Sequence, residues 1–110
     1  MKTPFRLAHA VAIALVSITL MTAGSLAKKV PPIADDIPAW APMQALARWD
    51  SGWYGEIAKN GYWLNPGQQS PVVFFPGYPM SVRLLTWVGM NRWVAGEVLS
   101  LACALAAIFL

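Results

Sequence analysis

The sequence predicts an all-α membrane protein. Of its 110 residues, 57% are hydrophobic and only 12% are charged, which is about half the charged fraction of an ordinary soluble domain. The apolar residues concentrate in residues 7–27 and 93–110, so two transmembrane segments are expected rather than one globular core. The net charge of +3 is too small and too dispersed to indicate a nucleic-acid partner.

The first apolar segment, residues 7–27, contains no formal charge. Its helix would be about 31 Å long, enough to cross a hydrocarbon core of about 30 Å. A removable signal peptide is the alternative, because Ser25-Leu26-Ala27 has the small-x-small pattern of a cleavage site. The second apolar segment favours a retained anchor. Cations of the kind that flank such anchors are Lys2, Arg6, Lys28 and Lys29.

The next segment, residues 28–41, is expected to be an extended connector. Pro31, Pro32 and Pro38 exclude a continuous helix there. Asp35 and Asp36 are compatible with a metal or substrate site. We favour solvated loop carboxylates that cap the following helix, because no other ligand is close in sequence.

An amphipathic helix is predicted from Pro42 to Asn60, either continuous or as two short helices broken near Gly52. Such a helix would lie in the membrane interface. At 100° per residue the apolar side chains share one face, and Asp50 projects into that face. The residues of this face are Met43, Leu46, Trp49, Trp53, Tyr54, Ile57 and Ala58.

Residues 62–71 are rich in turn formers and predict a loop. A helix over about residues 79–89 would be only ~16 Å long, too short to span a membrane by itself. We therefore expect an interfacial or re-entrant helix, with Arg83 extending its guanidinium to the headgroups. A tilted span that begins at Val72 is the alternative.

The last segment, residues 93–110, is the second predicted span, with Trp93 in the aromatic belt and Glu97 near its start. Cys103 is expected to be a small packing residue, because a lone cysteine has no disulfide or metal partner. No polar flank follows this segment. We therefore expect the chain to be the N-terminal part of a longer protein or a truncated reading frame.

A carboxylate on an apolar interfacial face is costly unless it has a partner or a task. Asp50 has two structural explanations: an ion pair with Arg48, or capping of a helix broken at Gly52. The functional explanation is general base catalysis, since desolvation moves a carboxyl pKa toward the range that suits proton abstraction from a hydroxyl. The neighbouring tryptophans suit carbohydrate, because flat apolar rings stack on the CH faces of sugars. Interfacial anchoring explains Trp40 and Trp63 equally well.

The sequence contains no zinc-ligand spacing, phosphate loop, nucleophile elbow or Cys/His pair. His9 stands alone in an apolar helix and is better explained by packing than by ligation. No metal and no cofactor is therefore expected.

The runs ALARWDSGWYGEIAKNGYW and SPVVFFPGYPMSVRLL resemble the N-terminal part of the PIG-V family of mannosyltransferases and its bacterial relatives. The resemblance covers about residues 45–85, and the pairing of the two motifs is what makes it specific. These are multi-pass glycosyltransferases of the GT-C type, so the resemblance implies a GT-C-like N-terminal part with interfacial amphipathic helices in its first outer loop. It favours a cytoplasmic N-terminus and a membrane site in the bacterial inner membrane or an ER-like membrane, with residues 28–92 on the outer or luminal side.

The resemblance also implies roles for individual residues. Family members transfer a sugar from a polyprenyl-phosphate donor, such as polyprenyl-phosphate mannose, and their catalytic carboxylate lies in the first outer loop. That role carries over to Asp50 as the general base. Trp49 would be the neighbour of Asp50 in the site, and Arg48 would contact the donor phosphate. The remaining substrate-binding candidates are Trp53, Tyr54, Phe75, Pro76, Tyr78 and Pro79.

The expected function is thus that of the N-terminal part of an inverting membrane glycosyltransferase, inactive without further transmembrane helices or a partner subunit. Membrane lipids and the lipid-linked donor are its expected partners. The alternatives are a small non-catalytic membrane protein, either an assembly factor or a degenerate remnant, and a secreted peptide released after Ala27.

Overall fold

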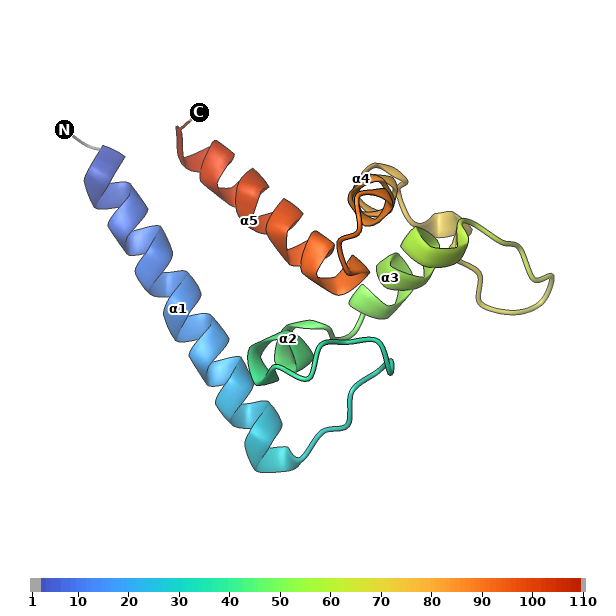
Figure 1. The fold of residues 1–110 in the computed structure, drawn as a ribbon, viewed down its shortest axis with the longest axis horizontal. Helices are drawn as coiled ribbons and strands as arrows, with labels where there is room; N and C mark the ends of the chain where they lie inside the picture. The colour runs from blue at the N-terminus through green and yellow to red at the C-terminus, as the bar shows by residue number, and fades with distance from the viewer. Residues whose placement is uncertain (1–2, 110) are drawn as a thin grey trace. The chain divides into compact units, whose positions relative to one another are not determined.

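The computed structural model describes residues 3–109, with the side chains of residues 6–108. This part of the chain holds helices and no strand (Figure 1), which confirms the all-α prediction. Two compact units are distinguished: one reaches to Arg48 and includes the residues from Ser100 onward, and the other is Trp49–Leu99. In chain order the elements are α1 (Thr3–Lys28), α2 (Ala41–Leu46), α3 (Ser51–Asn60), η1 (Pro71–Val73), α4 (Gly77–Trp87) and α5 (Arg92–Phe109).

Helix α1 confirms the helix predicted over residues 7–27. Within residues 3–109 it is the one helix long and apolar enough to cross a membrane, over Arg6–Lys28, and none of that stretch is buried. Two of its hydroxyls bond within the helix: Thr19 donates to the Leu15 carbonyl and Thr22 to the Ile18 carbonyl, both at 2.7 Å. Such bonds suit a helix in lipid, where water cannot satisfy polar groups. Two residues discussed above, Lys2 and Leu110, lie outside the described residues.

In the first unit, α2 packs against α1 and buries Met43 and Ala45. The connector between the two helices has no helix of its own, as its prolines predict. Arg48 binds this connector: its guanidinium donates to the carbonyls of Pro31 and Val30, the latter at 3.2 Å. Arg48 therefore fixes the connector in place, and its predicted contact with the donor phosphate stays a prediction.

The predicted helix over Pro42–Asn60 is broken, so the continuous version is wrong and the version with two short helices is correct. Ala47 has φ −76° and ψ 75°, and the Arg48 N–H donates to the Leu46 carbonyl at 2.9 Å, which is an inverse γ-turn. Trp49 follows with φ 47°. The break thus precedes Gly52. The expectation that the apolar residues of α2 share one helix face with Asp50 is therefore wrong.

The second unit has its core where α3, α4 and the start of α5 meet. Ala58, Val82 and Ala95 are buried at its centre, and α3 packs directly against α4. Tyr78, Leu85, Met90 and Leu99 pack around this core. Small residues allow the helices to approach closely: a Cβ at Gly55 of α3 would lie 2.7 Å from the Trp93 ring, and one at Gly96 of α5 would lie 2.8 Å from the Tyr78 hydroxyl oxygen.

Helix α4 confirms the short helix predicted over residues 79–89, although it begins two residues earlier. The alternative, a tilted span from Val72, is wrong because residues 74–76 are not helical. Trp93 also departs from expectation. Its side chain is only 6% exposed and packs against Gly55, so it is a core residue of this unit rather than a member of an outward-facing aromatic belt.

Helix α5 covers the second predicted transmembrane segment. Asn91 begins it, since its Oδ1 accepts hydrogen bonds from the N–H groups of Trp93 (2.9 Å) and Val94 (3.4 Å). The helical prediction is therefore confirmed. That α5 crosses a membrane is not shown, because α1 alone satisfies the length and hydropathy of a span among the described helices.

Candidate functional site

Asp50 lies immediately before α3 in a helical backbone conformation, φ −64° and ψ −14°. Its carbonyl accepts the Tyr54 N–H at 3.1 Å. Residues three and four apart on a helix are neighbours, so the carboxylate shares its side of the helix with Trp53 and Tyr54. The side chain is exposed and makes no capping hydrogen bond, so the capping explanation of Asp50 is wrong.

Trp49, the residue before Asp50, has a left-handed backbone. Its φ of 47° is unfavourable for a residue with a Cβ, and its side chain is 82% exposed. The surrounding structure therefore holds a large aromatic ring in solvent at a strained position. Strained residues of this kind concentrate at functional sites.

A continuous row of contacting aromatic rings, called the ring chain below, runs from α3 through the loop to α4. Trp53 stacks on Trp63 (centroids 6.3 Å, planes 29° apart) and on Phe74 (5.8 Å, 25°). Tyr54 then meets Phe74 edge to face at 5.3 Å and Tyr78 at 5.2 Å. The Tyr78 hydroxyl donates to the Gly96 carbonyl at 3.0 Å, so the end of this ring chain is fixed to α5.

The structure thus brings together three of the predicted substrate-binding residues, Trp53, Tyr54 and Tyr78. It adds Phe74 and Trp63, which the sequence reasoning did not select for the site. The signal for Phe74 was present, because it belongs to the same FFPGYP motif as the residues that were chosen. For Trp63 the competing explanation, interfacial anchoring, had equal weight.

The other candidates of the second motif lie apart from this ring chain. Phe75 is 80% exposed and its ring lies against Gly77. Pro76 precedes α4 at the N-cap position. Pro79 is fully buried, so it is a packing residue that a substrate does not reach.

An open cleft of about 520 Å³ adjoins the ring chain. Its floor includes Trp53 and Phe74, and its wall is the loop of residues 64–70, which projects from the helices in Figure 1. Within that loop Asn65-Pro66-Gly67-Gln68 is a type II turn: Gly67 has φ 77°, and the Gln68 N–H donates to the Asn65 carbonyl at 3.1 Å. The rest of the lining is Leu64, Gln69, Ser70, Val72 and Val73.

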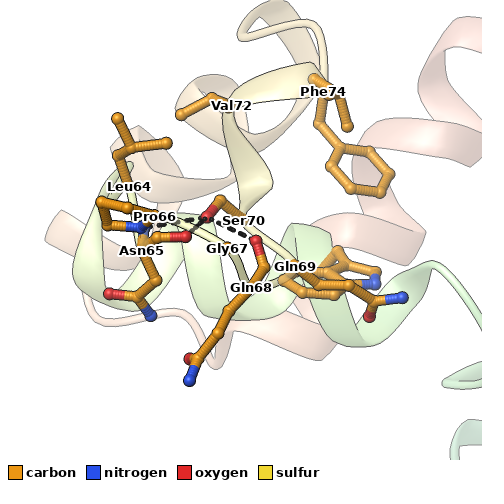
Figure 2. A pocket seen from close by; sticks show the side chains of 11 residues that line it. Leu64, Asn65, Pro66, Gly67, Gln68, Gln69, Ser70, Val72 and Phe74 are labelled. Carbon is orange, nitrogen blue, oxygen red and sulfur yellow. Dashed lines mark hydrogen bonds between the residues drawn. The ribbon is translucent and has the colours of Figure 1, made fainter.

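Ser70 closes this loop (Figure 2). Its Oγ accepts the Asn65 N–H at 2.9 Å, and its hydroxyl faces the Gln68 carbonyl at 3.3 Å. On the other side of the cleft, the Tyr62 hydroxyl donates to the Phe74 carbonyl at 2.9 Å. These bonds fix the wall and the floor, so the cleft is formed before any ligand binds.

Among residues 6–108 no group of three or more His, Cys, Asp or Glu side chains is placed to hold a metal ion. Cys103 is a free thiol on α5. The carboxylate of Glu56, six residues beyond Asp50, pairs with Arg92. Asp50 is thus the carboxylate at this site that has no described partner and remains open to a ligand.

Comparison of the chain with known protein families, with functionally characterised proteins and with solved structures found no match in any of the three.

Proposed function

We propose that this chain contributes the first outer-loop site of a membrane glycosyltransferase, with Asp50 as the general base. The base would take the proton of an acceptor hydroxyl while that oxygen attacks the anomeric carbon of a polyprenyl-phosphate sugar. The phosphate then leaves with the bonding electrons, so direct displacement with inversion needs a single base. No metal or nucleotide is required.

The observation that carries the proposal is the position of Asp50 one helical turn before Trp53 and Tyr54. An exposed carboxylate without a described partner lies beside a fixed row of aromatic rings, and such rings can support the apolar face of a sugar. The strained, exposed Trp49 next to it is a second indication of function at the same point. The resemblance to the PIG-V family, carried by both motifs, supports the same role.

The membrane setting of the proposal is multi-pass. The structure gives one helix, α1, with the length and composition of a span. We propose that α5 is the second, with residues 28–92 on the outer or luminal side. A polyprenyl chain needs a groove between several helices, so residues 1–110 alone should insert into a membrane without transferring sugar, and further helices or a partner subunit would complete the site.

Since α1 is the only described helix with the properties of a span, a small non-catalytic membrane protein is the second candidate. In that case the ring chain would be a packing feature, and Asp50 a solvated loop carboxylate. The two candidates differ in what happens when Asp50 loses its charge.

The decisive experiment measures sugar transfer by membranes that contain the protein expressed from its own gene, with radiolabelled polyprenyl-phosphate mannose as donor. Asp50→Asn should reduce the rate by about 10²–10⁴-fold, the usual contribution of a positioned base, without reducing membrane insertion. Asp35→Asn is the matched control, an exposed loop carboxylate whose loss should leave the rate unchanged. An Asp50→Asn rate above a tenth of wild type would exclude the general-base role. Absence of transfer by the wild-type protein when the further helices or the partner subunit are present would favour the non-catalytic candidate.

A further inference from the structure

The cleft beside the ring chain has a lining without charge. It consists of one serine, three side-chain amides and apolar or aromatic groups. A phosphate would need Arg, Lys or a row of backbone N–H groups, and a cationic ligand would need a carboxylate. The lining therefore selects against ions of both signs, and it distinguishes this cleft from a site for the phosphate of a lipid donor.

The polar groups of the lining are available to a ligand. The side-chain amides of Asn65, Gln68 and Gln69 make no hydrogen bond to other residues in the described part of the chain. Figure 2 shows the amides of Asn65 and Gln68 extending from the same side of the loop. Each amide offers two donors and one acceptor oxygen, which matches the hydroxyl groups of a sugar, since every hydroxyl both donates and accepts.

Aromatic rings form the apolar side of the cleft. Trp53 and Phe74 both line it, and they stack on one another with their planes 25° apart. Aromatic groups and amides in one lining suit a pyranose ring, which has apolar CH groups and a rim of hydroxyls. The volume of about 520 Å³ lies within the range of about 300–1,000 Å³ typical of ligand pockets.

We infer that this cleft binds a neutral saccharide, packed against the Trp53–Phe74 ring pair and hydrogen-bonded by the amides of the loop of residues 64–70. Because Trp53 also lies one turn from Asp50, the bound sugar would be the acceptor. That acceptor role rests on the proposed function, whereas the binding itself does not. The exposed apolar rim of the cleft, which includes Leu64 and Val73, would remain free for contact with lipid headgroups or with the remainder of a longer glycan.

Saturation-transfer-difference NMR on the full chain in lipid nanodiscs tests the inference. The neutral probes are methyl α-mannopyranoside and methyl β-glucopyranoside. The charged counterpart is the methyl glycoside of glucuronic acid, whose carboxylate is ionised at neutral pH. The neutral glycosides should give signals strongest at ring CH protons, and the charged one should give signals at least several-fold weaker. Gln69→Ala and Asn65→Ala should reduce the neutral signals several-fold. Gln44→Ala is the matched control, because Gln44 is the one glutamine outside the loop.

Binding should survive Asp50→Asn, which separates this inference from the general-base proposal. Failure of transfer with binding intact would overturn the function and leave the saccharide site standing. Equal signals in the Gln69→Ala and wild-type proteins, or equal signals from the neutral and charged glycosides, would overturn the site. Strong broadening of the side-chain amide signals of Asn65, Gln68 and Gln69 by spin-labelled acyl chains would also overturn it, because lipid would then occupy the cleft.

Discussion

The guanidinium of Arg92 donates a 2.9 Å hydrogen bond to the carboxylate of Glu56 and a 2.8 Å bond to the carbonyl of Gly55. It also lies over the ring of Trp93, 4.8 Å from the centroid. The first residue of α5 is thereby fixed to the middle of α3, and α3 carries the residues that follow Asp50. The arginine side chain is 6% exposed, whereas that of Glu56 is 42% exposed, so the two partners should respond differently to substitution.

Arg92→Ala should destabilise the fold by about 2–3 kcal/mol, because it removes a buried side chain together with its hydrogen bonds to Glu56 and Gly55 and its contact with the Trp93 ring. Glu56→Gln should cost about 1 kcal/mol or less, since the pair is open to solvent on that side and the amide oxygen still accepts. Equilibrium unfolding in detergent, followed by circular dichroism, measures both. Lys59→Gln, a change at an exposed cation of the same helix, is the control and should stay within about 0.5 kcal/mol. Equal losses for Arg92→Ala and Glu56→Gln would contradict this account.

Gly55→Ala should also be destabilising. A Cβ at this position would lie 2.7 Å from Cη2 of Trp93, and the indole is buried and has little room to move. Overpacking of this kind costs about 1–3 kcal/mol, which exceeds the roughly 1 kcal/mol that alanine gains over glycine in a helix.

Gly24→Ala is the matched control for Gly55→Ala, because nothing lies within 4 Å of the added Cβ. It should be neutral or stabilising in the same unfolding experiment. If both variants were stabilised equally, the contact between Gly55 and Trp93 would not be a feature of the folded protein.

Local patterns in the sequence predicted the helical segments well. The apolar run and its flanking cations located α1, the prolines excluded a helix from the connector, and the turn formers of residues 62–71 predicted the loop that forms the wall of the cleft. Each of these signals depends on residues close together in the chain. Such signals fix an element without fixing what it packs against.

What could not be predicted depends on contacts between distant residues or on one unusual backbone conformation. Arg92 pairs with Glu56 across 36 positions, and no local pattern selects that partner. Trp93 was predicted to be an interfacial anchor, because a tryptophan at the start of an apolar segment is typical of one. Its packing on Gly55 cannot be read from the neighbouring sequence. The break before α3 depends on φ 47° at Trp49, and tryptophan is not a residue that predicts a left-handed backbone. The partly predicted aromatic cluster has the same origin, because Phe74 and Trp53 meet only once the loop has folded back.

Trp49→Gly should maintain or raise stability by up to about 1 kcal/mol, because glycine adopts a positive φ without steric cost and the exposed indole contributes little packing. Trp40→Gly is the matched control, at an exposed tryptophan with an ordinary φ of −71°. It should lose about 0.4–1 kcal/mol, since only the flexibility of the unfolded chain changes. Under the proposed function Trp49→Gly should at the same time lower sugar transfer. A clear loss of stability in Trp49→Gly would show that the left-handed conformation is not strained.

Asn91→Ala should loosen the start of α5. The Oδ1 atom accepts the N–H groups of Trp93 and Val94, and loss of an N-cap costs about 1 kcal/mol. Hydrogen exchange should therefore accelerate at these two amides and remain unchanged in the middle of α1. Asn91→Asp retains the acceptor and adds a charge that suits a helix N-terminus, so it should preserve protection. Faster exchange in Asn91→Asp as well would assign the effect to another role of Asn91.

The topology of the proposed enzyme can be tested by cysteine labelling in intact cells. If α1 is a retained span with a cytoplasmic N-terminus, the loop that contains Asp50 and the cleft faces the outside. Asn60→Cys and Gln68→Cys should then react with a membrane-impermeant maleimide, since both positions are exposed in the fold. The experiment needs the Cys103→Ser background, because Cys103 is an exposed free thiol, and that background protein is the unlabelled control.

The N-terminal sequence of the mature protein should begin before Lys28. Protection at both positions would place the loop in the cytoplasm, away from a luminal or periplasmic donor, and a mature N-terminus at Lys28 would identify α1 as a cleaved signal peptide. Either result would require a different membrane arrangement for the proposed active site.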